Sequence, residues 1–340
     1  MRVLELTGHD GPSALRVADR PRPTAPKDGV IIDVEAIGIN FPDLLATKGM
    51  YQYKPELPYI PGCEVAGRIR EAAPGSIFTP GERVAAFVWE GGYAESVWAP
   101  DRSVMPLPAS VTSEIGAALV VNYHTVHFGL SVRGQLKAGE SLLVLGSGGG
   151  IGTAALQVGQ ALGARVVAAV TDDNQEVTAR GAGAQETLRV EGGFAQGMLD
   201  LTEGRGFDVV LDPLGDRYFT EAIRGLAPGG RILVVGFAAG EIPTVAVNRL
   251  LFRNIAVVGV AWGAFLEVDP DIVAVAGRDL THMLERSAIA PHIAEVSTFE
   301  LIPEALARLE RGEIRGKAVA TLALKSPGRP GRPGQAASVT

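Results

Sequence analysis

The chain has 340 residues, more than one ordinary domain needs and enough for two domains with sizeable cores. Its net charge of −7 argues against a nucleic-acid partner, because such a partner requires clustered Lys and Arg. The single cysteine, Cys63, cannot form an internal disulfide, and no run approaches eighteen apolar residues. We therefore expect a cytoplasmic protein that has no transmembrane helix.

The first part of the chain predicts a β domain. Short β-rich runs alternate there with turn residues, at 1–6, 30–34, 65–69, 83–88 and 94–97. Proline and glycine separate these runs at short intervals, which is typical of a compact, barrel-like β domain.

After a helix expected at 114–121, strand and helix signals alternate. The expected strands are residues 141–146, 165–170, 207–211, 231–235 and 255–260, and the helices are 151–162, a segment from about 175, and 219–225. These strands are nearly continuous in Val, Ile and Leu, as buried parallel strands are. The alternation predicts a doubly wound α/β domain. A helix at 270–286, a strand at 318–324 and a Pro/Gly-rich tail that we expect to be disordered complete the chain.

A glycine-rich turn, residues 146–152, joins the first of these strands to a helix in the pattern Gly-x-x-Gly-Gly-x-Gly. Glycines let the backbone approach a pyrophosphate closely, and the helix N-terminus offers free N–H groups. No Lys-Ser/Thr pair follows, so this is not a nucleoside-triphosphate loop. The turn predicts a dinucleotide site.

The next strand bears on the choice of cofactor. An acidic residue at its end would select NAD, but Val170 stands there and Thr171 follows, which favours NADPH over NADH. However, Asp172 and Asp173 come next and no cation is close in sequence. Arg180 or Arg189 could supply the missing positive charge.

Four stretches together resemble the zinc-free quinone oxidoreductases of the medium-chain dehydrogenase/reductase superfamily. They are the glycine-rich turn, residues 38–43 (Gly-Ile-Asn-Phe-Pro-Asp), residues 58–67 (Pro-Tyr-Ile-Pro-Gly-Cys-Glu-Val-Ala-Gly) and residues 227–237 (Ala-Pro-Gly-Gly-Arg-Ile-Leu-Val-Val-Gly-Phe). The resemblance extends from the first strand to about residue 324. In the same family a lysine generally stands where Gln175 falls here, so the chain departs from the pattern at the expected phosphate site.

The resemblance implies a fold with two domains. A GroES-like β-barrel catalytic domain would comprise residues 1–121 and 264–325, a doubly wound Rossmann domain would comprise 122–263, and 326–340 would be the tail. The active site would lie in the cleft between the two domains.

It also implies that no metal takes part. Zinc-dependent members place a cysteine and a histidine where Asn40 and Cys63 stand, and zinc requires three or four Cys, His or carboxylate ligands held together. The five scattered histidines are interpreted as surface or packing residues.

Three residues are catalytic candidates by resemblance. Asn40 would hydrogen-bond the nicotinamide ribose or the acceptor, although it could simply form a turn. Asp43 is a weaker candidate that could only cap a helix. Tyr51 would line the substrate site and orient the acceptor or donate a proton, and plain packing is its alternative role. Phe128 could wall the acceptor site or belong to the core.

The cofactor contacts come from the glycine-rich turn, from the ends of parallel strands and from positions implied by the resemblance. The residues expected to bind NADPH are Thr125, Gly146, Gly149, Gly150, Ile151, Gly152, Thr171, Gly236, Phe237 and Asn248.

We therefore expect an NADPH-dependent reductase that transfers hydride to a quinone or related enone, because such acceptors need less polarisation than a simple carbonyl. Two alternatives stay open: a reductase of enoyl thioesters or alkenals, and a non-catalytic NADPH-binding protein. No nucleic acid or membrane partner is expected. A homodimer is implied mainly by the resemblance, and the apolar strand at residues 254–260, which would lie at a sheet edge, agrees with it.

Overall fold

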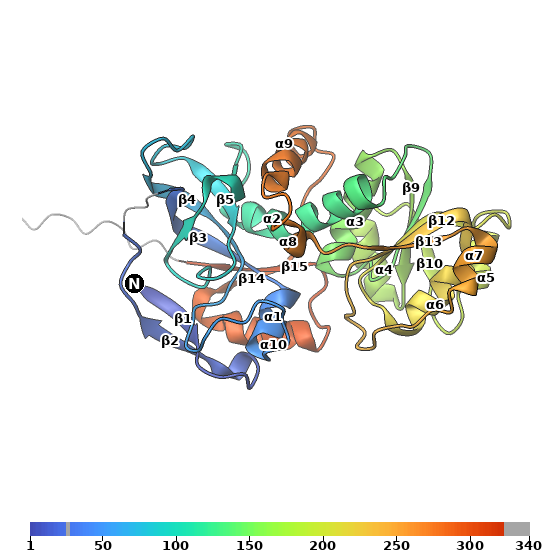
Figure 1. Cartoon of the computed structure of the whole chain (residues 1–340), viewed down its shortest axis with the longest axis horizontal. Coiled ribbons are helices and arrows are strands. Elements are labelled where there is room, and N and C mark those ends of the chain that lie inside the picture. The colour runs from blue at the N-terminus through green and yellow to red at the C-terminus, as the bar shows by residue number, and fades with distance from the viewer. Residues whose placement is uncertain (25–27, 323–340) are drawn as a thin grey trace, which may run out of the picture.

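The computed structural model describes residues 1–24 and 28–322. Two β-sheets lie on either side of a central pair of helices, α2 (Ser113–His127) and α3 (Gly150–Ala161) (Figure 1). The expected disordered tail lies outside the described residues. The fold is the predicted combination of a β-rich domain and a doubly wound α/β domain.

The β domain is built on a seven-stranded sheet. Its path is β14-β15-β3-β4-β5-β7, and β6 pairs with β3. The strands are β3 (Val30–Ile39), β4 (Glu64–Ala72), β5 (Arg83–Phe87), β6 (Ser96–Ala99), β7 (Val104–Pro106), β14 (Ile293–Thr298) and β15 (Lys317–Thr321). A separate hairpin joins β1 (Arg2–Leu6) to β2 (Leu15–Asp19). The last two strands of the described residues thus join the sheet that begins with β3.

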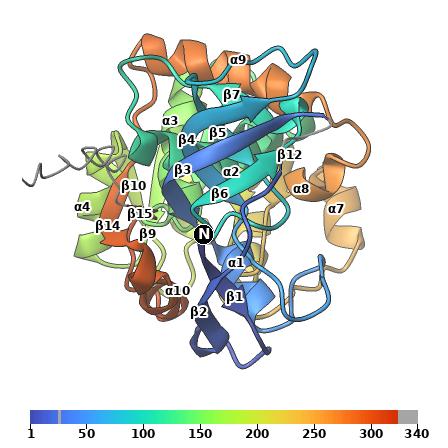
Figure 2. The ribbon, with the colours of Figure 1, turned by 90° about the vertical axis from the view of Figure 1, so that its left-hand side faces the viewer.

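Three helices flank this domain, with α9 and α10 on opposite sides of the sheet (Figure 2). They are α1 (Phe41–Thr47), α9 (Ile272–Glu285) and α10 (Ile302–Glu310). Short 3-10 turns occur at Pro12–Ala14, Asp101–Ser103 and Phe299–Leu301.

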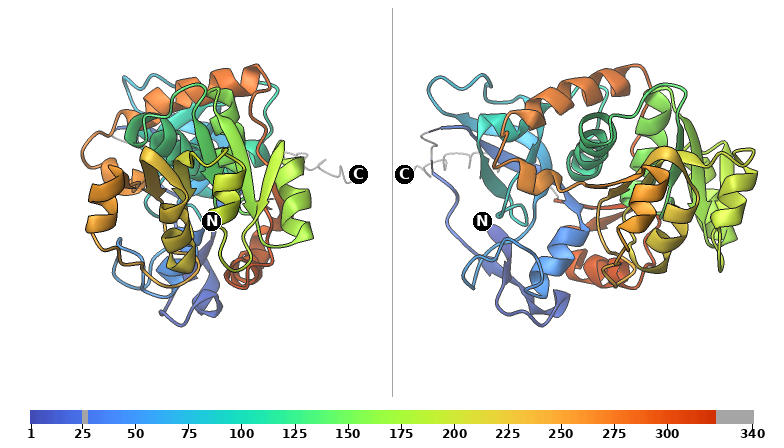
Figure 3. Two further views of the ribbon diagram at one scale, coloured as in Figure 1. Left: turned by 90° about the vertical axis from the view of Figure 1, so that its right-hand side faces the viewer. Right: turned by 45° about the vertical axis from the view of Figure 1, so that its right-hand side comes forward.

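The second domain contains a six-stranded sheet in the order β10-β9-β8-β11-β12-β13, with every neighbouring pair parallel. The strands are β8 (Ser141–Val144), β9 (Arg165–Val170), β10 (Glu186–Arg189), β11 (Phe207–Asp212), β12 (Leu226–Val234) and β13 (Ala256–Gly259). This order reverses direction between β8 and β11, the point where doubly wound sheets bind dinucleotides. Helices cover both faces of the sheet (Figure 3). Besides α3 they are α4 (Asp173–Gly181), α5 (Ala195–Asp200), α6 (Asp216–Arg224) and α7 (Asn248–Arg253), and the short α8 (Trp262–Phe265) leads back to the β domain.

One apolar core cluster spans both domains, in addition to a separate cluster within each domain. Helix α2 is buried along most of its length, and a single apolar cluster includes Ala66 of β4, Ala117 of α2 and Leu142 of β8. The boundaries expected at 121/122 and 263/264 lie inside α2 and α8, so neither is marked by a linker. Domain placement is therefore set by side-chain packing.

Helix α2 continues into a π-helical turn, Phe128–Arg133, and together they form one stretch of 21 residues. By length and composition this stretch is apolar enough to cross a membrane, although polar residues such as Asn122 and His124 interrupt its apolar run. However, 78% of its apolar window is buried inside the protein, as in the core helix of a soluble domain.

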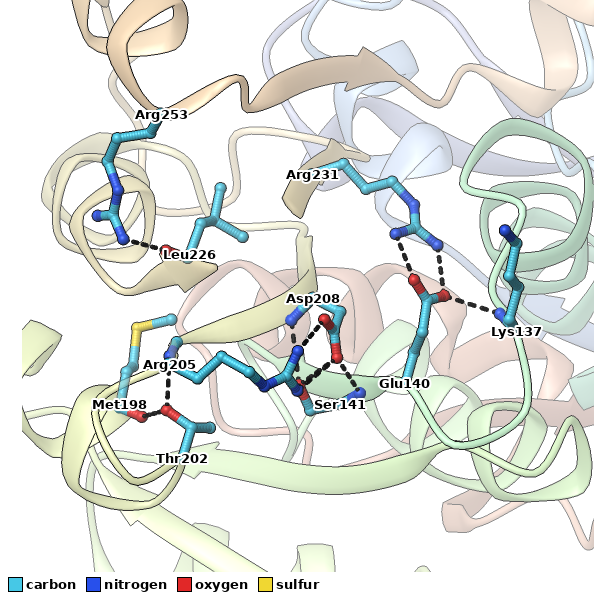
Figure 4. A network of polar contacts seen from close by, with 11 residues as sticks. Lys137, Glu140, Ser141, Met198, Thr202, Arg205, Asp208, Leu226, Arg231 and Arg253 are labelled. Carbon is cyan, nitrogen blue, oxygen red and sulfur yellow. Dashed lines mark hydrogen bonds and ion pairs between the residues drawn. The ribbon is translucent and has the colours of Figure 1, made fainter. Parts of the chain in front are cut away.

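Polar side chains hold the amino ends of the central parallel strands (Figure 4). Asp208 accepts the Ser141 N–H at 2.8 Å and pairs with Arg205 at 2.5 Å. Arg231 pairs with Glu140 at 2.7 Å. These contacts join the starts of β8 and β11 to the middle of β12. The opposite, carboxyl edge carries the turns that face the β domain.

Candidate active site

The glycine-rich turn lies between β8 and α3, as predicted. Gly146 has φ of 62°, a left-handed conformation that favours glycine. A Cβ on Gly152 would stand 2.1 Å from the carbonyl oxygen of Gly146, so only glycine allows this close turn. Gly149 is the N-cap of α3 and brings no capping side chain. Ser147 points inward, with Oγ 2.8 and 2.7 Å from two strand carbonyl oxygens.

The outer face of the turn is therefore bare backbone at a helix N-terminus. A Cβ on Gly149 would meet only the Gly146 carbonyl oxygen, at 3.5 Å, so the space outside it is open. Free N–H groups and the helix dipole suit an anion. This cradle fits the pyrophosphate of a dinucleotide cofactor. Ile151 follows in the first turn of α3.

Further turns line up beside it on the carboxyl edge. A Cβ on Gly146 would lie 3.3 Å from Pro213, and one on Gly236 would lie 3.5 Å from the Pro213 carbonyl oxygen. Phe237, 39% exposed, packs against Gly215. The turns after β8, β11 and β12 therefore meet, and they bring together the glycine turn with Gly236 and Phe237.

Two other predicted cofactor residues differ in their placement. Thr125 is half-buried on α2, one turn from Asn122, whose amide nitrogen lies 2.4 Å from the place of a Cβ on Gly150. Asn248 is exposed at the start of α7, and α7 ends where Arg253 donates to the carbonyl oxygens of Arg224 and Leu226, at the amino end of β12. Thr125 thus lies one helical turn from a residue that contacts the glycine turn, whereas α7, which begins at Asn248, ends at the opposite, amino edge of the sheet.

The end of β9 has no acidic side chain in line with the strand. Val170 is fully buried, and the Thr171 N–H donates to Gln175 Oε1 at 3.0 Å. Asp172 caps α4 by accepting the Gln175 N–H at 2.8 Å, and this hydrogen bond is the main reason that the pKa of Asp172 is lowered. Arg315, from the β domain, stands 3.5 Å from Asp172.

A buried polar cluster lies at the centre of the β domain. Asn40, 4% exposed, donates from Nδ2 to Glu64 Oε2 at 3.0 Å and to the Gly38 carbonyl at 3.2 Å. Lys317 donates to Asn40 Oδ1 and pairs with Glu64 at 2.5 Å. The second oxygen of Glu64 accepts the Val121 N–H of α2 at 2.8 Å. Asn40 therefore bridges a buried ion pair and caps α1, and its amide is engaged with protein groups on both sides.

Asp43 and Cys63 lie next to this cluster. Asp43 Oδ2 accepts the Asn40 N–H at 2.9 Å, completing a capping box. Burial raises the pKa of Asp43 to about 6, against the opposing effects of Lys317 and this hydrogen bond. Burial also raises the pKa of the Cys63 thiol, whose Sγ is 3.6 Å from the Asn40 amide. Asp43 thus caps the helix, as the alternative role proposed, and its carboxyl loses its proton only near pH 6.

Tyr51 is half-buried in the loop after α1. Burial raises its pKa to about 12, and the charges of Cys63 and Asp43 add to this effect. Its hydroxyl therefore stays protonated at neutral pH and can donate a hydrogen bond. A Cβ on Gly263 would lie 3.7 Å from this hydroxyl and 3.7 Å from the Trp89 ring, so Tyr51 and Trp89 face the start of α8.

Aromatic rings continue from Trp89 toward α2. Phe87 packs edge-on against Trp89 and against Trp262, each at 5.1 Å between ring centroids. His124 stacks on Trp262 at 5.4 Å, and burial lowers its pKa to about 4, so it is neutral. Phe128, a wall or core candidate, is fully buried against another ring and belongs to the core.

Fold and site together define a dinucleotide-dependent oxidoreductase scaffold. Residues 26–109 match the family "Alcohol dehydrogenase GroES-like domain", and residues 150–276 match "Zinc-binding dehydrogenase". The chain is 33% identical to "Quinone oxidoreductase-like protein 2" of Bos taurus over 305 residues, covering 89% of this chain and 87% of that protein.

Two solved structures superpose closely. A probable oxidoreductase from Mycobacterium abscessus is 39% identical with a TM-score of 0.87, covering 95% of this chain and 99% of that one. A mycobacterial protein complexed with NADPH is 29% identical, also with a TM-score of 0.87, covering 95% and 100%. The chain belongs to the quinone oxidoreductase family of the medium-chain dehydrogenase/reductase superfamily, and it is an oxidoreductase.

One of the matching families is described as zinc-binding, so we compared the side chains at this site with the ligands that zinc requires. Within residues 1–24 and 28–322, no three His, Cys, Asp or Glu side chains are placed to hold a metal ion. Next to Asn40 and Cys63 the ammonium of Lys317 already neutralises Glu64. One thiol and one amide beside the positively charged Lys317 side chain do not provide the ligands that zinc requires. Zinc independence stays a prediction that metal analysis tests.

Proposed function

We propose that the protein is a zinc-independent, NADPH-dependent reductase that transfers a hydride to a quinone or a related conjugated carbonyl compound. The observation that carries the proposal is the bare glycine turn before α3, on the edge of the parallel sheet that faces the β domain. On the β-domain side, a row of aromatic rings extends from Tyr51 through Trp89 and Phe87 to Trp262. NADPH is the cofactor, and when bound it supplies the hydride.

The residues around Tyr51 suit a planar acceptor. Flat conjugated rings pack well against aromatic side chains, and Trp89, which is 38% exposed, offers such a surface, while Trp262 is buried in the same ring cluster. The protonated Tyr51 hydroxyl would donate a hydrogen bond to a carbonyl oxygen as negative charge develops there. A quinone needs no stronger polarisation than this hydrogen bond, because the electron pair that it receives with the hydride is delocalised over its conjugated ring.

Steady-state oxidation of NADPH, followed at 340 nm, tests the proposal. The acceptors are 1,2-naphthoquinone, a trans-2-alkenal and a crotonyl thioester, and we expect the quinone to have the highest kcat/KM. Tyr51→Phe should lower kcat/KM for the quinone, whereas the matched Tyr218→Phe, on α6 of the other domain, should not. A preference for the thioester would establish the enoyl-thioester alternative, and no turnover with any acceptor would indicate a non-catalytic NADPH-binding protein.

We also propose that the protein forms a homodimer through β13. This strand lies at one edge of the six-stranded sheet, as expected, and most of its residues are exposed. Apolar side chains continue the surface on α7, where Leu251 is 69% and Phe252 is 78% exposed. Pairing of two β13 strands about a two-fold axis would satisfy the open edge and cover these side chains. Light scattering should show twice 35.5 kDa, and Phe252→Asp should shift the mass toward the monomer. A monomer at micromolar concentration would contradict this.

A further inference from the structure

We propose that Arg315, a residue of the β domain, is the cation that distinguishes the 2′-phosphate of NADPH from the hydroxyl of NADH. The inference rests on the proposed cofactor and deepens it by naming the residue that sets cofactor preference. Charge-assisted bonds from Arg are well suited to phosphate.

The location of Arg315 carries the argument. It lies in the connection between α10 and β15 and comes directly before Gly316, which has φ of 115°. The Gly316 carbonyl oxygen lies 3.4 Å from the place of a Cβ on Gly150, the first residue of α3. The connection therefore touches the glycine cradle from the β-domain side.

This placement is held by hydrogen bonds on both sides. Gln157 of α3 receives the Ala290 N–H at 2.9 Å and donates to the Ala290 carbonyl at 2.8 Å. The Lys317 N–H donates to the His292 carbonyl at 2.9 Å. The residues just before β14 are thus held against α3 and against Lys317, the first residue of β15 and only two positions after Arg315. From this position the Arg315 side chain reaches Asp172 beyond the end of β9.

The two arginines suggested by the sequence are engaged elsewhere. Arg180 pairs with Glu176 at 2.8 Å, one turn along α4. Arg189 pairs with Glu176 at 2.8 Å and also contacts Asp173. Both guanidinium groups therefore already neutralise carboxylates of α4.

Arg315 has a looser partner. Its guanidinium is 3.5 Å from Asp172, and the carboxylate of Asp172 also caps α4 through the Gln175 N–H at 2.8 Å. The Arg315 side chain is 33% exposed, so it is accessible to a ligand at this point. A phosphate beside Thr171 would compete with Asp172 for Arg315. Asp172 would repel the same phosphate, which predicts a preference for NADPH that is real but limited.

Dissociation constants for NADPH and NADH, measured by calorimetry, test the inference. Arg315→Gln should weaken NADPH binding by about tenfold, the lower range of a charge-assisted hydrogen bond because the group is partly exposed, and should leave NADH within about twofold. Arg189→Gln is the matched control, an arginine of the same region whose loss should leave the ratio of the two constants unchanged.

A second variant reads the opposing charge. Asp172→Asn keeps a capping side chain but removes the carboxylate, so NADPH should bind more tightly and NADH should change little. Competition by adenosine 2′-monophosphate, which carries only the distinguishing phosphate, should weaken in Arg315→Gln.

The results separate two kinds of failure. If the unmodified protein binds neither cofactor, the proposed function fails and this inference fails with it. If it binds both and Arg315→Gln changes neither constant, or changes both equally, the function stands and Arg315 does not read the 2′-phosphate.

Discussion

Replacing Gly149 by valine should abolish the cofactor site while leaving the fold nearly intact. Gly149 has φ of −94° and ψ of 176°, an extended conformation that a β-branched residue adopts without strain. A Cβ there meets only one carbonyl oxygen, at 3.5 Å, which is an ordinary contact. The remaining cost is the poor capping preference of valine, so we expect a loss of about 1 kcal/mol in the free energy of unfolding.

The same side chain would fill the space outside the helix N-terminus. It would keep a pyrophosphate from the backbone N–H groups, and each lost charge-assisted hydrogen bond contributes about 1.5–3 kcal/mol. That is a weakening of roughly 10–150-fold for a single bond. The dissociation constant for NADPH should therefore rise by at least roughly 10–150-fold.

Gly152→Ala provides the contrast. Its Cβ would lie 2.1 Å from the Gly146 carbonyl oxygen, so the turn itself must move and the protein should lose about 1–3 kcal/mol or more of stability. Urea unfolding and calorimetric titration with NADPH, on both variants, compare the two effects. Unaltered NADPH affinity in Gly149→Val would show that the cofactor does not bind at this turn.

Three further predictions concern the polar cluster of the β domain. Lys317→Met leaves the fully buried Glu64 without its cation and should cost about 3–5 kcal/mol of stability, part of which Glu64→Gln in the same chain should restore; a loss below about 1 kcal/mol in urea unfolding would contradict the buried pair. The pKa of Asp43 is raised to about 6, so between about pH 4 and pH 6 its carboxyl keeps a proton in the folded protein that it loses in the unfolded chain. Stability relative to Asp43→Asn should therefore fall by at most about 3 kcal/mol as the pH rises from about 4 to 6. A rise in stability over this window would refute the assignment. Because Asn40 and Cys63 do not form a zinc site, dialysis against a chelator should leave activity intact, and a loss that zinc restores would overturn this prediction.

The sequence predicts the dinucleotide domain well because its signals are local. Apolar runs such as residues 165–170 coincide with β9, and the glycine turn is found between strand and helix as expected. Some elements are longer than expected. The helix expected at 114–121 extends to His127, and its second half was not predicted because it carries polar residues such as Asn122 and His124, which are nevertheless buried.

The elements missed by the sequence analysis had weaker signals or depended on the fold. Strand β14 (Ile293–Thr298) alternates partly buried and exposed residues, but it pairs in parallel with β15, which follows only after the intervening helix α10. Helix α10 has a proline in its first turn, a typical signal of a helix start from which the sequence could have predicted it.

The candidate site was predicted in part. Asn40, Asp43 and Cys63 come together, yet their partners Glu64 and Lys317 are 253 positions apart, and no local pattern links them. The same holds for Arg315, because its proximity to Asp172 arises only when the last strands return to the first sheet. Tertiary contacts of this kind are set by topology.

Single-turnover oxidation of NADPH tests the central claim most directly. The protein is mixed in excess with NADPH and 1,2-naphthoquinone, using cofactor deuterated at one or the other C4 position, and absorbance is followed at 340 nm. The account predicts that one deuterated form, and only one, reacts more slowly and leaves NADP+ without deuterium, whereas the other form keeps its deuterium in NADP+. It also predicts that Gly149→Val reduces the rate to that of the reagents alone. Equal rates with both deuterated forms, or an unchanged rate in Gly149→Val, would contradict hydride transfer at this site.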